Sequence, residues 1–143
     1  QLTYHSYLTS PSPQILNYLW HSFSFSNPMN EGILQQQIVN YLVEQQKYFT
    51  FRFFQCPNEG KRKVWYLKKL KRMGMKSGVP DLILEFKGSR FVYVEIKMPK
   101  GRLSTAQKIW KMQSAILGTP FYVVKGTFKE CKKQLDSIFK DHG

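Results

Sequence analysis

The sequence is poor in acidic residues. It has 143 residues, with 9 Asp and Glu against 22 Lys and Arg, which gives a formal net charge of +13. An excess of positive charge on this scale favours a polyanionic partner, because each phosphate that a protein neutralises releases condensed counterions. The alternative is a basic protein with no such partner. Nucleic acid is therefore the first partner that the composition suggests.

Cysteines and long apolar runs are also scarce. The two cysteines, Cys56 and Cys131, form no CxxC pair, which argues against a disulfide framework or a thiolate zinc site. Reduced thiols are typical of an intracellular compartment. No apolar run approaches the roughly 20 residues that span a membrane, and the first residues lack the basic and apolar regions of a secretory signal. We expect an intracellular protein, in the cytoplasm or, in a eukaryote, the nucleus.

Charge is absent from the start of the chain: residues 1–30 contain no Lys, Arg, Asp or Glu. We expect residues 1–29 to be an extension that packs on the domain or on a partner subunit. Residues 30–143 are expected to form one globular domain, since a hydrophobic content of 42% and an aromatic content of 15% argue against disorder.

Hydrophobic periodicity predicts elements in the order α-β-α-β-β-α-β-α. The predicted helices are Asn30–Lys47, with Asn30 as N-cap, Val64–Met73, Leu103–Leu117 and Thr127–Lys140. The predicted strands are Tyr48–Phe54, Asp81–Phe86, Phe91–Lys97 and Phe121–Lys125. This order describes an α/β fold in which helices flank a small mixed sheet.

Charged residues stand at the ends of two neighbouring predicted strands. Asp81 begins one strand, and Glu95 and Lys97 end the next. If the turn between them contains the three residues 87–89, Asp81 faces Glu95, and all three charges share one face of the sheet. A two-residue turn would place Asp81 opposite Ile96 instead.

Two carboxylates in such a position need a counter-charge. At a separation of about 4 Å they repel by roughly 4 kcal/mol at an effective dielectric constant of about 20. Lys97 offsets part of this repulsion, and Mg²⁺ or Mn²⁺, which prefer oxygen ligands, would offset more. A metal ion there activates water and polarises a phosphoryl oxygen, while Lys97 stabilises developing charge. The alternative is a structural ion pair at a solvated sheet edge.

Basic residues are concentrated before this acidic site. Between Gly60 and Val79 there is no acid, and the predicted helix carries its lysines and arginines on one side, with Trp65 among them. A solvated charge run is the alternative to a nucleic-acid track. We expect this segment to guide a phosphate backbone by shape, because no base-reading motif is present. The residues expected to contact nucleic acid are Lys61, Arg62, Trp65, Lys68, Lys69, Arg72, Lys76, Lys100 and Arg102.

In order along the chain, these patterns resemble the VRR-NUC family of the PD-(D/E)XK nuclease superfamily. The matching motifs are Glu31-x-x-Leu34-Gln35-x-x-Ile38-x-x-Tyr41-Leu42, PNEGKR (57–62), LKRMGMKSGVPDLIL (70–84), VEIK (94–97) and GRLSTAQKIW (101–110). They cover Asn30 to Phe139, and residues 1–29 fall outside the resemblance.

The resemblance implies a restriction-endonuclease-like core and a role for each site residue. It implies that Asp81, Glu95 and the Ile96 carbonyl ligate the metal, with Glu31 as an additional acid, and that Lys97 is the catalytic lysine. The alternative for Glu31 is a first-turn acid that complements the helix dipole.

Gln107 matches a glutamine of the family that lies near the active site. Its spacing from Ser104 is also that of a helix capping box. Both interpretations remain open on the sequence alone.

Together these features predict a Mg²⁺- or Mn²⁺-dependent DNA endonuclease. Similarity to the family's stand-alone members implies a homodimer that cuts four-way (Holliday) junctions. The alternatives are a non-catalytic nucleic-acid-binding module and a nuclease that prefers 5′ flaps or a defined sequence. Two further groups are assigned no chemistry: the histidines His5, His21 and His142, which lack partners for a triad, and Glu85, which we expect to be a strand-face residue.

Overall fold

The structure is a computed structural model that describes residues 29–56 and 63–143. The expected extension, with His5 and His21, therefore lies outside the described residues except for Met29. The PNEGKR segment, with Lys61 and Arg62, also lies outside them. The helices are α2 (Glu31–Gln45), α3 (Val64–Arg72), α4 (Thr105–Leu117) and α5 (Phe128–His142). The strands are β1 (Phe51–Gln55), β2 (Leu82–Phe86), β3 (Arg90–Lys97) and β4 (Phe121–Lys125).

The strands form one mixed sheet in the order β1-β2-β3-β4. Strand β2 is antiparallel to both β1 and β3, whereas β4 runs parallel to β3 after the crossover through α4. Phe86 pairs with Arg90 and Leu82 with Val94, which is the register that a three-residue turn requires. The predicted hairpin register is therefore confirmed, and with it the α/β fold class.

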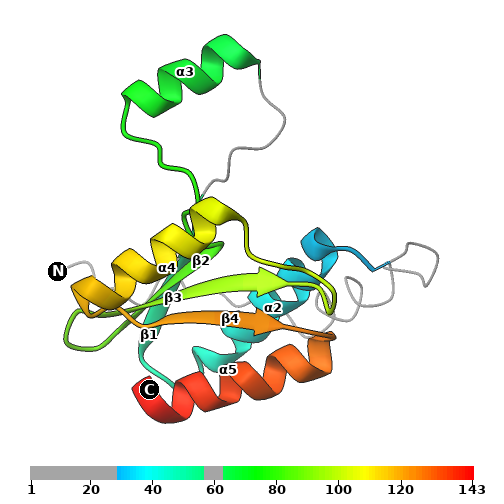
Figure 1. Cartoon of the computed structure of the whole chain (residues 1–143). Coiled ribbons are helices and arrows are strands. Elements are labelled where there is room, and N and C mark those ends of the chain that lie inside the picture. Colours follow the sequence, from blue (N-terminus) through cyan, green and yellow to red (C-terminus); the bar gives the residue numbers. More distant parts are fainter. Residues whose placement is uncertain (1–28, 57–62) are drawn as a thin grey trace, which may run out of the picture.

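Helices cover both faces of the sheet unequally. Helices α2 and α5 lie on one face, and α4 lies over the other (Figure 1). The face under α2 and α5 holds the apolar core, whose fully buried side chains come from both helices and from alternate positions of the strands. Its largest fully buried aliphatic side chains are those of Leu34, Ile38, Leu42, Leu82, Leu84, Ile96, Leu135 and Ile138. The opposite face is free to carry the polar residues of β3.

Most elements begin or end within a few residues of their predicted limits, and Asn30 is the N-cap, since its side chain accepts a hydrogen bond from the Ile33 N–H at 3.0 Å. The first strand is the largest difference: it begins at Phe51 rather than Tyr48. The chain turns there, with the amides of residues 48 and 49 bonded back to the Gln45 carbonyl. Phe49 then stacks on Phe139 of α5, with ring centroids 4.9 Å apart. Its aromatic character thus serves packing rather than strand pairing.

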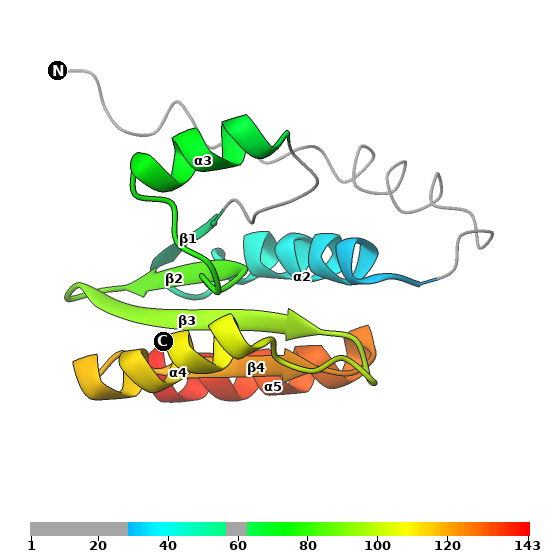
Figure 2. The same cartoon turned by 45° about the horizontal axis from the view of Figure 1, so that its top comes forward.

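Helix α3 stands apart from the rest of the molecule. Both views show it projecting beyond the sheet on the segment between β1 and β2 (Figures 1 and 2). None of its residues is buried. In the part of the chain that is described, no helix combines the length and the apolar character that crossing a membrane requires.

Candidate active site

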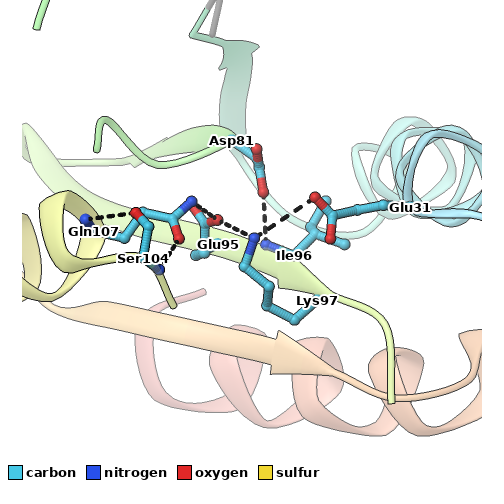
Figure 3. A network of polar contacts seen from close by, with 7 residues as sticks. All are labelled: Glu31, Asp81, Glu95, Ile96, Lys97, Ser104 and Gln107. Carbon is cyan, nitrogen blue, oxygen red and sulfur yellow. Dashed lines mark hydrogen bonds and ion pairs between the residues drawn. The ribbon is translucent and has the colours of Figure 1, made fainter. Parts of the chain in front are cut away.

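Three charged side chains are buried where β2 begins and β3 ends. Asp81, Glu95 and Lys97 are 5%, 0% and 8% exposed. Ionised side chains are rarely buried unless they are paired. Because Asp81 directly precedes the Leu82–Val94 pair, it stands opposite Glu95 on the neighbouring strand. Figure 3 shows all three gathered at one end of the sheet.

Polar contacts connect these residues to each other and to α2 (Figure 3). The Lys97 Nζ lies 2.9 Å from the Glu95 Oε1 and 3.6 Å from the Oε1 of Glu31, in the first turn of α2. The backbone N–H of Ile96 donates to the Asp81 Oδ2 at 2.8 Å. The fold thus brings together the five residues Glu31, Asp81, Glu95, Ile96 and Lys97 that were predicted to act together.

The cluster contains more negative than positive groups. Burial raises the pKa of Glu95 to about 7; the hydrogen bond from Lys97 opposes this, and the charges of Asp81 and Glu31 reinforce it. Burial alone would lower the pKa of Lys97, but the hydrogen bond to Glu95 and the charges of the three carboxylates outweigh it and raise that pKa. The two shifts share a contribution from the neighbouring carboxylates: three acids surround one base, so the cluster favours additional positive charge.

One atom of this cluster gives a direct indication of where positive charge is needed. Glu95 Oε2 is buried and has no hydrogen-bond partner within the described residues. An unsatisfied buried carboxylate oxygen costs free energy, and a cation bound there would remove that cost. The donors available at this point are carboxylate oxygens and backbone, which suit Mg²⁺ or Mn²⁺ rather than zinc. The residues present therefore fit the expected metal ion.

The structure limits the role of Glu31. Within residues 29–56 and 63–143, no group of three His, Cys, Asp or Glu side chains is placed to hold a metal ion. The Glu31 carboxylate, nearly half of which is exposed, contacts the Lys97 ammonium instead. Asp81 and Glu95 would thus need a backbone carbonyl and water to complete a coordination shell.

Gln107 makes the capping-box contacts and also lies against the charged cluster. Ser104 is the N-cap of α4: its hydroxyl accepts the Gln107 N–H at 3.2 Å, and its own N–H donates to the Gln107 Oε1 at 2.8 Å. The amide of Gln107 is therefore fixed by the capping box. Its Nε2 then donates to the Glu95 Oε1, which Lys97 also contacts (Figure 3).

Two glycines, whose roles the sequence reasoning missed, hold loops close to the site. A Cβ on Gly78 would lie 2.4 Å from the backbone C and O of Ala106, so this loop crosses the first turn of α4 directly beside Gln107. A Cβ on Gly101 would lie 3.2 Å from the Cβ and Cδ of Lys97, so that loop packs on the lysine stem. Gly78 stands in the motif LKRMGMKSGVPDLIL (70–84), but its contact with α4 is long-range and leaves no local signal.

The predicted nucleic-acid-binding residues lie apart from this cluster, on the surface. Trp65, Lys68, Lys69 and Arg72 are exposed on α3. Lys76 is also exposed, but it follows the end of the helix, because the chain leaves the helical path at Gly74 with φ of 99°. Lys100 and Arg102 are exposed in the loop between β3 and α4.

Glu85 and His142, the two described residues that were assigned no chemistry, make structural contacts. Glu85 pairs with Arg52 across β1 and β2. The His142 ring stacks on Phe86, with centroids 6.0 Å apart, and lies in hydrogen-bonding contact with the Tyr122 hydroxyl at 2.8 Å. The described contacts of these two residues are thus with Arg52, Phe86 and Tyr122, and not with Asp81, Glu95 or Lys97.

Comparisons with known proteins agree with this fold. The sequence profile of the VRR-NUC domain matches residues 14–128, a range that begins inside the segment left outside the motifs. A solved VRR_NUC domain protein is 23% identical to this chain, with a TM-score of 0.59. The match covers 81% of this chain and 89% of the solved chain. A second solved VRR_NUC domain is 20% identical, with a TM-score of 0.50. That match covers 74% of this chain and 94% of the solved chain. No curated protein matches the sequence. By the profile match, with the fold in agreement, the chain belongs to the VRR-NUC family of nuclease domains.

Proposed function

We propose that the protein is a metal-dependent endonuclease that hydrolyses phosphodiester bonds in DNA. The observation that carries the proposal is the buried cluster of Asp81, Glu95 and Lys97, in which Glu95 Oε2 lacks a partner among the described residues. In a purely structural ion pair, both oxygens of a buried carboxylate are normally hydrogen-bonded. Membership of a nuclease family supplies the reaction class.

Asp81, Glu95 and the Ile96 carbonyl would hold Mg²⁺ or Mn²⁺. When bound, such an ion supplies a more acidic water and stabilises charge on phosphoryl oxygens. Lys97, 2.9 Å from Glu95, is placed to orient the attacking water or to stabilise negative charge on the phosphate as it develops. Glu31 lies 3.6 Å from the same ammonium and limits where it can point.

Gln107 would act through Glu95. Its Nε2 and the Lys97 Nζ both contact Oε1 of that carboxylate. Two donors on one oxygen fix the rotation of the carboxylate and leave Oε2 as the atom available to a cation.

DNA binding is assigned to the exposed basic residues of α3 and of the loop before α4. These side chains are long, exposed and cationic, which suits contact with phosphates. We expect recognition of backbone shape, with little dependence on sequence.

Branched DNA, in particular the four-way junction, is the substrate that we propose, with a homodimer as the active form. A face for a second copy is available on α4, where Ile109, Met112 and Ile116 recur at helical spacing and are 46%, 59% and 78% exposed. Introducing lysine at Met112 and Ile116 should yield monomers in light scattering. A wild-type monomer would contradict the dimer.

The experiment that tests this function is cleavage of labelled four-way junction, 5′-flap and linear duplex DNA with Mg²⁺, with Mn²⁺ and with chelator. We expect metal-dependent cutting that is strongest on the junction and is lost in E95Q, while E95Q still binds DNA. Glu85 is a carboxylate on the same hairpin and has its own arginine partner. E85Q is therefore the matched control and should cut normally. Tight binding by the wild type without cutting under any metal would support the binding-module alternative.

A further inference from the structure

We propose that α3 is a base-stacking arm: Trp65 stacks on a base that is not covered by a neighbour in a continuous duplex, and the cations beside it hold the neighbouring phosphates. This inference rests on the proposed function and names the feature of branched DNA that the protein selects, namely an interruption of base stacking. A flap carries unpaired bases in its single strand, and a four-way junction keeps its bases paired but interrupts the stack at the branch point, whereas an intact duplex does neither.

The first support is the position of Trp65 on the helix. Trp65, Lys68, Lys69 and Arg72 stand at i, i+3, i+4 and i+7, so they form one stripe along α3. All four residues are exposed. This Trp65 stripe places an aromatic ring at one end and three cations along the next two turns, the combination that single-stranded nucleic acids bind.

The second support is that Trp65 is largely exposed and belongs to no core cluster of the described residues. It is 64% exposed, and no residue of α3 is buried. Its described ring contact is with Tyr66, the next residue, at 5.6 Å between centroids and in an edge-on arrangement. A tryptophan that contributes to the core would be largely buried, so the exposed ring is available to a ligand.

Charge decides what kind of ligand fits. Described residues 63–80 contain no acid, and lysines and arginines surround the exposed aromatic residues. A purely apolar partner would have to desolvate these cations, whereas a nucleic-acid strand neutralises them with phosphates and offers flat bases to the ring.

The third support is the connection between the arm and the candidate active site. After α3 the chain is held at Gly78 against the backbone of Ala106, reaches the buried Pro80 and arrives at Asp81. The contact at Gly78 fixes the base of the arm on the helix turn that carries Gln107. A base held by Trp65 would therefore set which phosphate reaches Glu95 and Lys97.

The test measures binding of metal-free protein in chelator to a duplex and to the same duplex with a short single-stranded gap. The variants are W65A, W65F and K68A. We expect the wild type to prefer the gapped DNA, and W65A to bind it about 5- to 100-fold more weakly with little change on the intact duplex. W65F should retain most of the preference, because it keeps a ring. K68A should weaken both complexes by a similar factor, since phosphates are common to both.

A reporter base in the gap gives an independent readout. 2-Aminopurine placed there should be quenched by the wild type and not by W65A. Equal weakening of both DNAs by W65A, or a wild type without preference for the gap, would overturn the proposal. Binding is measured without metal, so a loss of gap preference in W65A supports the arm even if the protein proves unable to cut. If the wild type cuts DNA but shows no preference for the gapped duplex, the stacking arm would be contradicted and the proposed nuclease activity would not.

Discussion

The candidate active site and the α3 arm both depend on charge, but in opposite surroundings. Lys97 is 8% exposed and lies among carboxylates, whereas the lysines of the Trp65 stripe are exposed on a helix with no buried residue. Burying an ionised group costs several kcal/mol, so buried charges persist where their exact placement matters. Exposed charges cost little and give non-specific, salt-dependent attraction. Under the proposed function, the first region would carry out the chemistry and the second would bind DNA.

One short segment joins the two regions. Gly78, with φ of 79°, lies between the arm and Asp81 and touches the turn of α4 that carries Gln107. A separation of catalysis from DNA binding would therefore depend on the loop that positions one region relative to the other. Substitutions in each region should change different measured quantities.

The largest effect is expected at Lys97. Lys97→Met keeps the buried stem and removes the ammonium beside Glu95, so kcat should fall by about 10²–10³-fold while DNA affinity changes little. Lys125 pairs with Lys97 in the parallel register of β3 and β4 but is exposed, which makes K125M the matched control. Equal losses of kcat in K97M and K125M would contradict the assignment of chemistry to the buried charge.

The next largest effect separates the two roles of Gln107. Gln107→Glu keeps a capping-box side chain but replaces the donor to Glu95 with a second carboxylate, so kcat should fall by about 10- to 100-fold and the repulsion between the two acids should lower the melting temperature. Gln107→Ala loses both functions and should also lower the melting temperature. If Q107E retained full activity, the hydrogen bond to Glu95 would have no catalytic role.

The loop between the regions should respond through stability. Gly78→Ala and Gly88→Ala both force alanine into a positive φ, of 79° and 81°, but only Gly78 has backbone atoms close to the added Cβ. We expect G78A to lose about 1–3 kcal/mol more of the free energy of unfolding than G88A, measured by urea denaturation. Equal losses would show that the contact with α4 is unimportant.

The smallest effect is expected on the arm. Each of K68A, K69A and R72A should reduce the slope of log affinity against log salt by about 0.9 on duplex DNA, with kcat unchanged at saturating DNA. Lys129→Ala, an exposed lysine on α5 across the sheet, should leave the slope unaltered. A lower kcat in the arm variants would break the division between binding and chemistry.

Local features of the sequence predicted the geometry that puts the charges together. The three-residue turn determined the hairpin register, and the period-two alternation of strands then placed Asp81, Glu95 and Lys97 on one face. These rules act over a few residues, so a single sequence reveals them. The capping box at Ser104 was visible for the same reason.

Contacts between distant segments were not predictable in this way. The sequence offered two interpretations of Gln107, and only the placement of α4 over β3 shows that one side-chain amide can bond to the Ser104 N–H and to Glu95 together. The approach of Gly78 to Ala106 and the packing of Phe49 on Phe139 depend equally on tertiary structure. The apolar residues of α3 fit an amphipathic pattern, but pattern alone does not say that this helix stands off the sheet.

Titration of Mn²⁺ into the DNA-free protein, followed by electron paramagnetic resonance, measures metal binding at Glu95 without any contribution from DNA. We expect a bound ion in the wild type and a loss of affinity of at least about tenfold in E95Q, with E85Q unchanged. Manganese binding that is the same in all three proteins, or absent from the wild type, would contradict a metal site at Glu95.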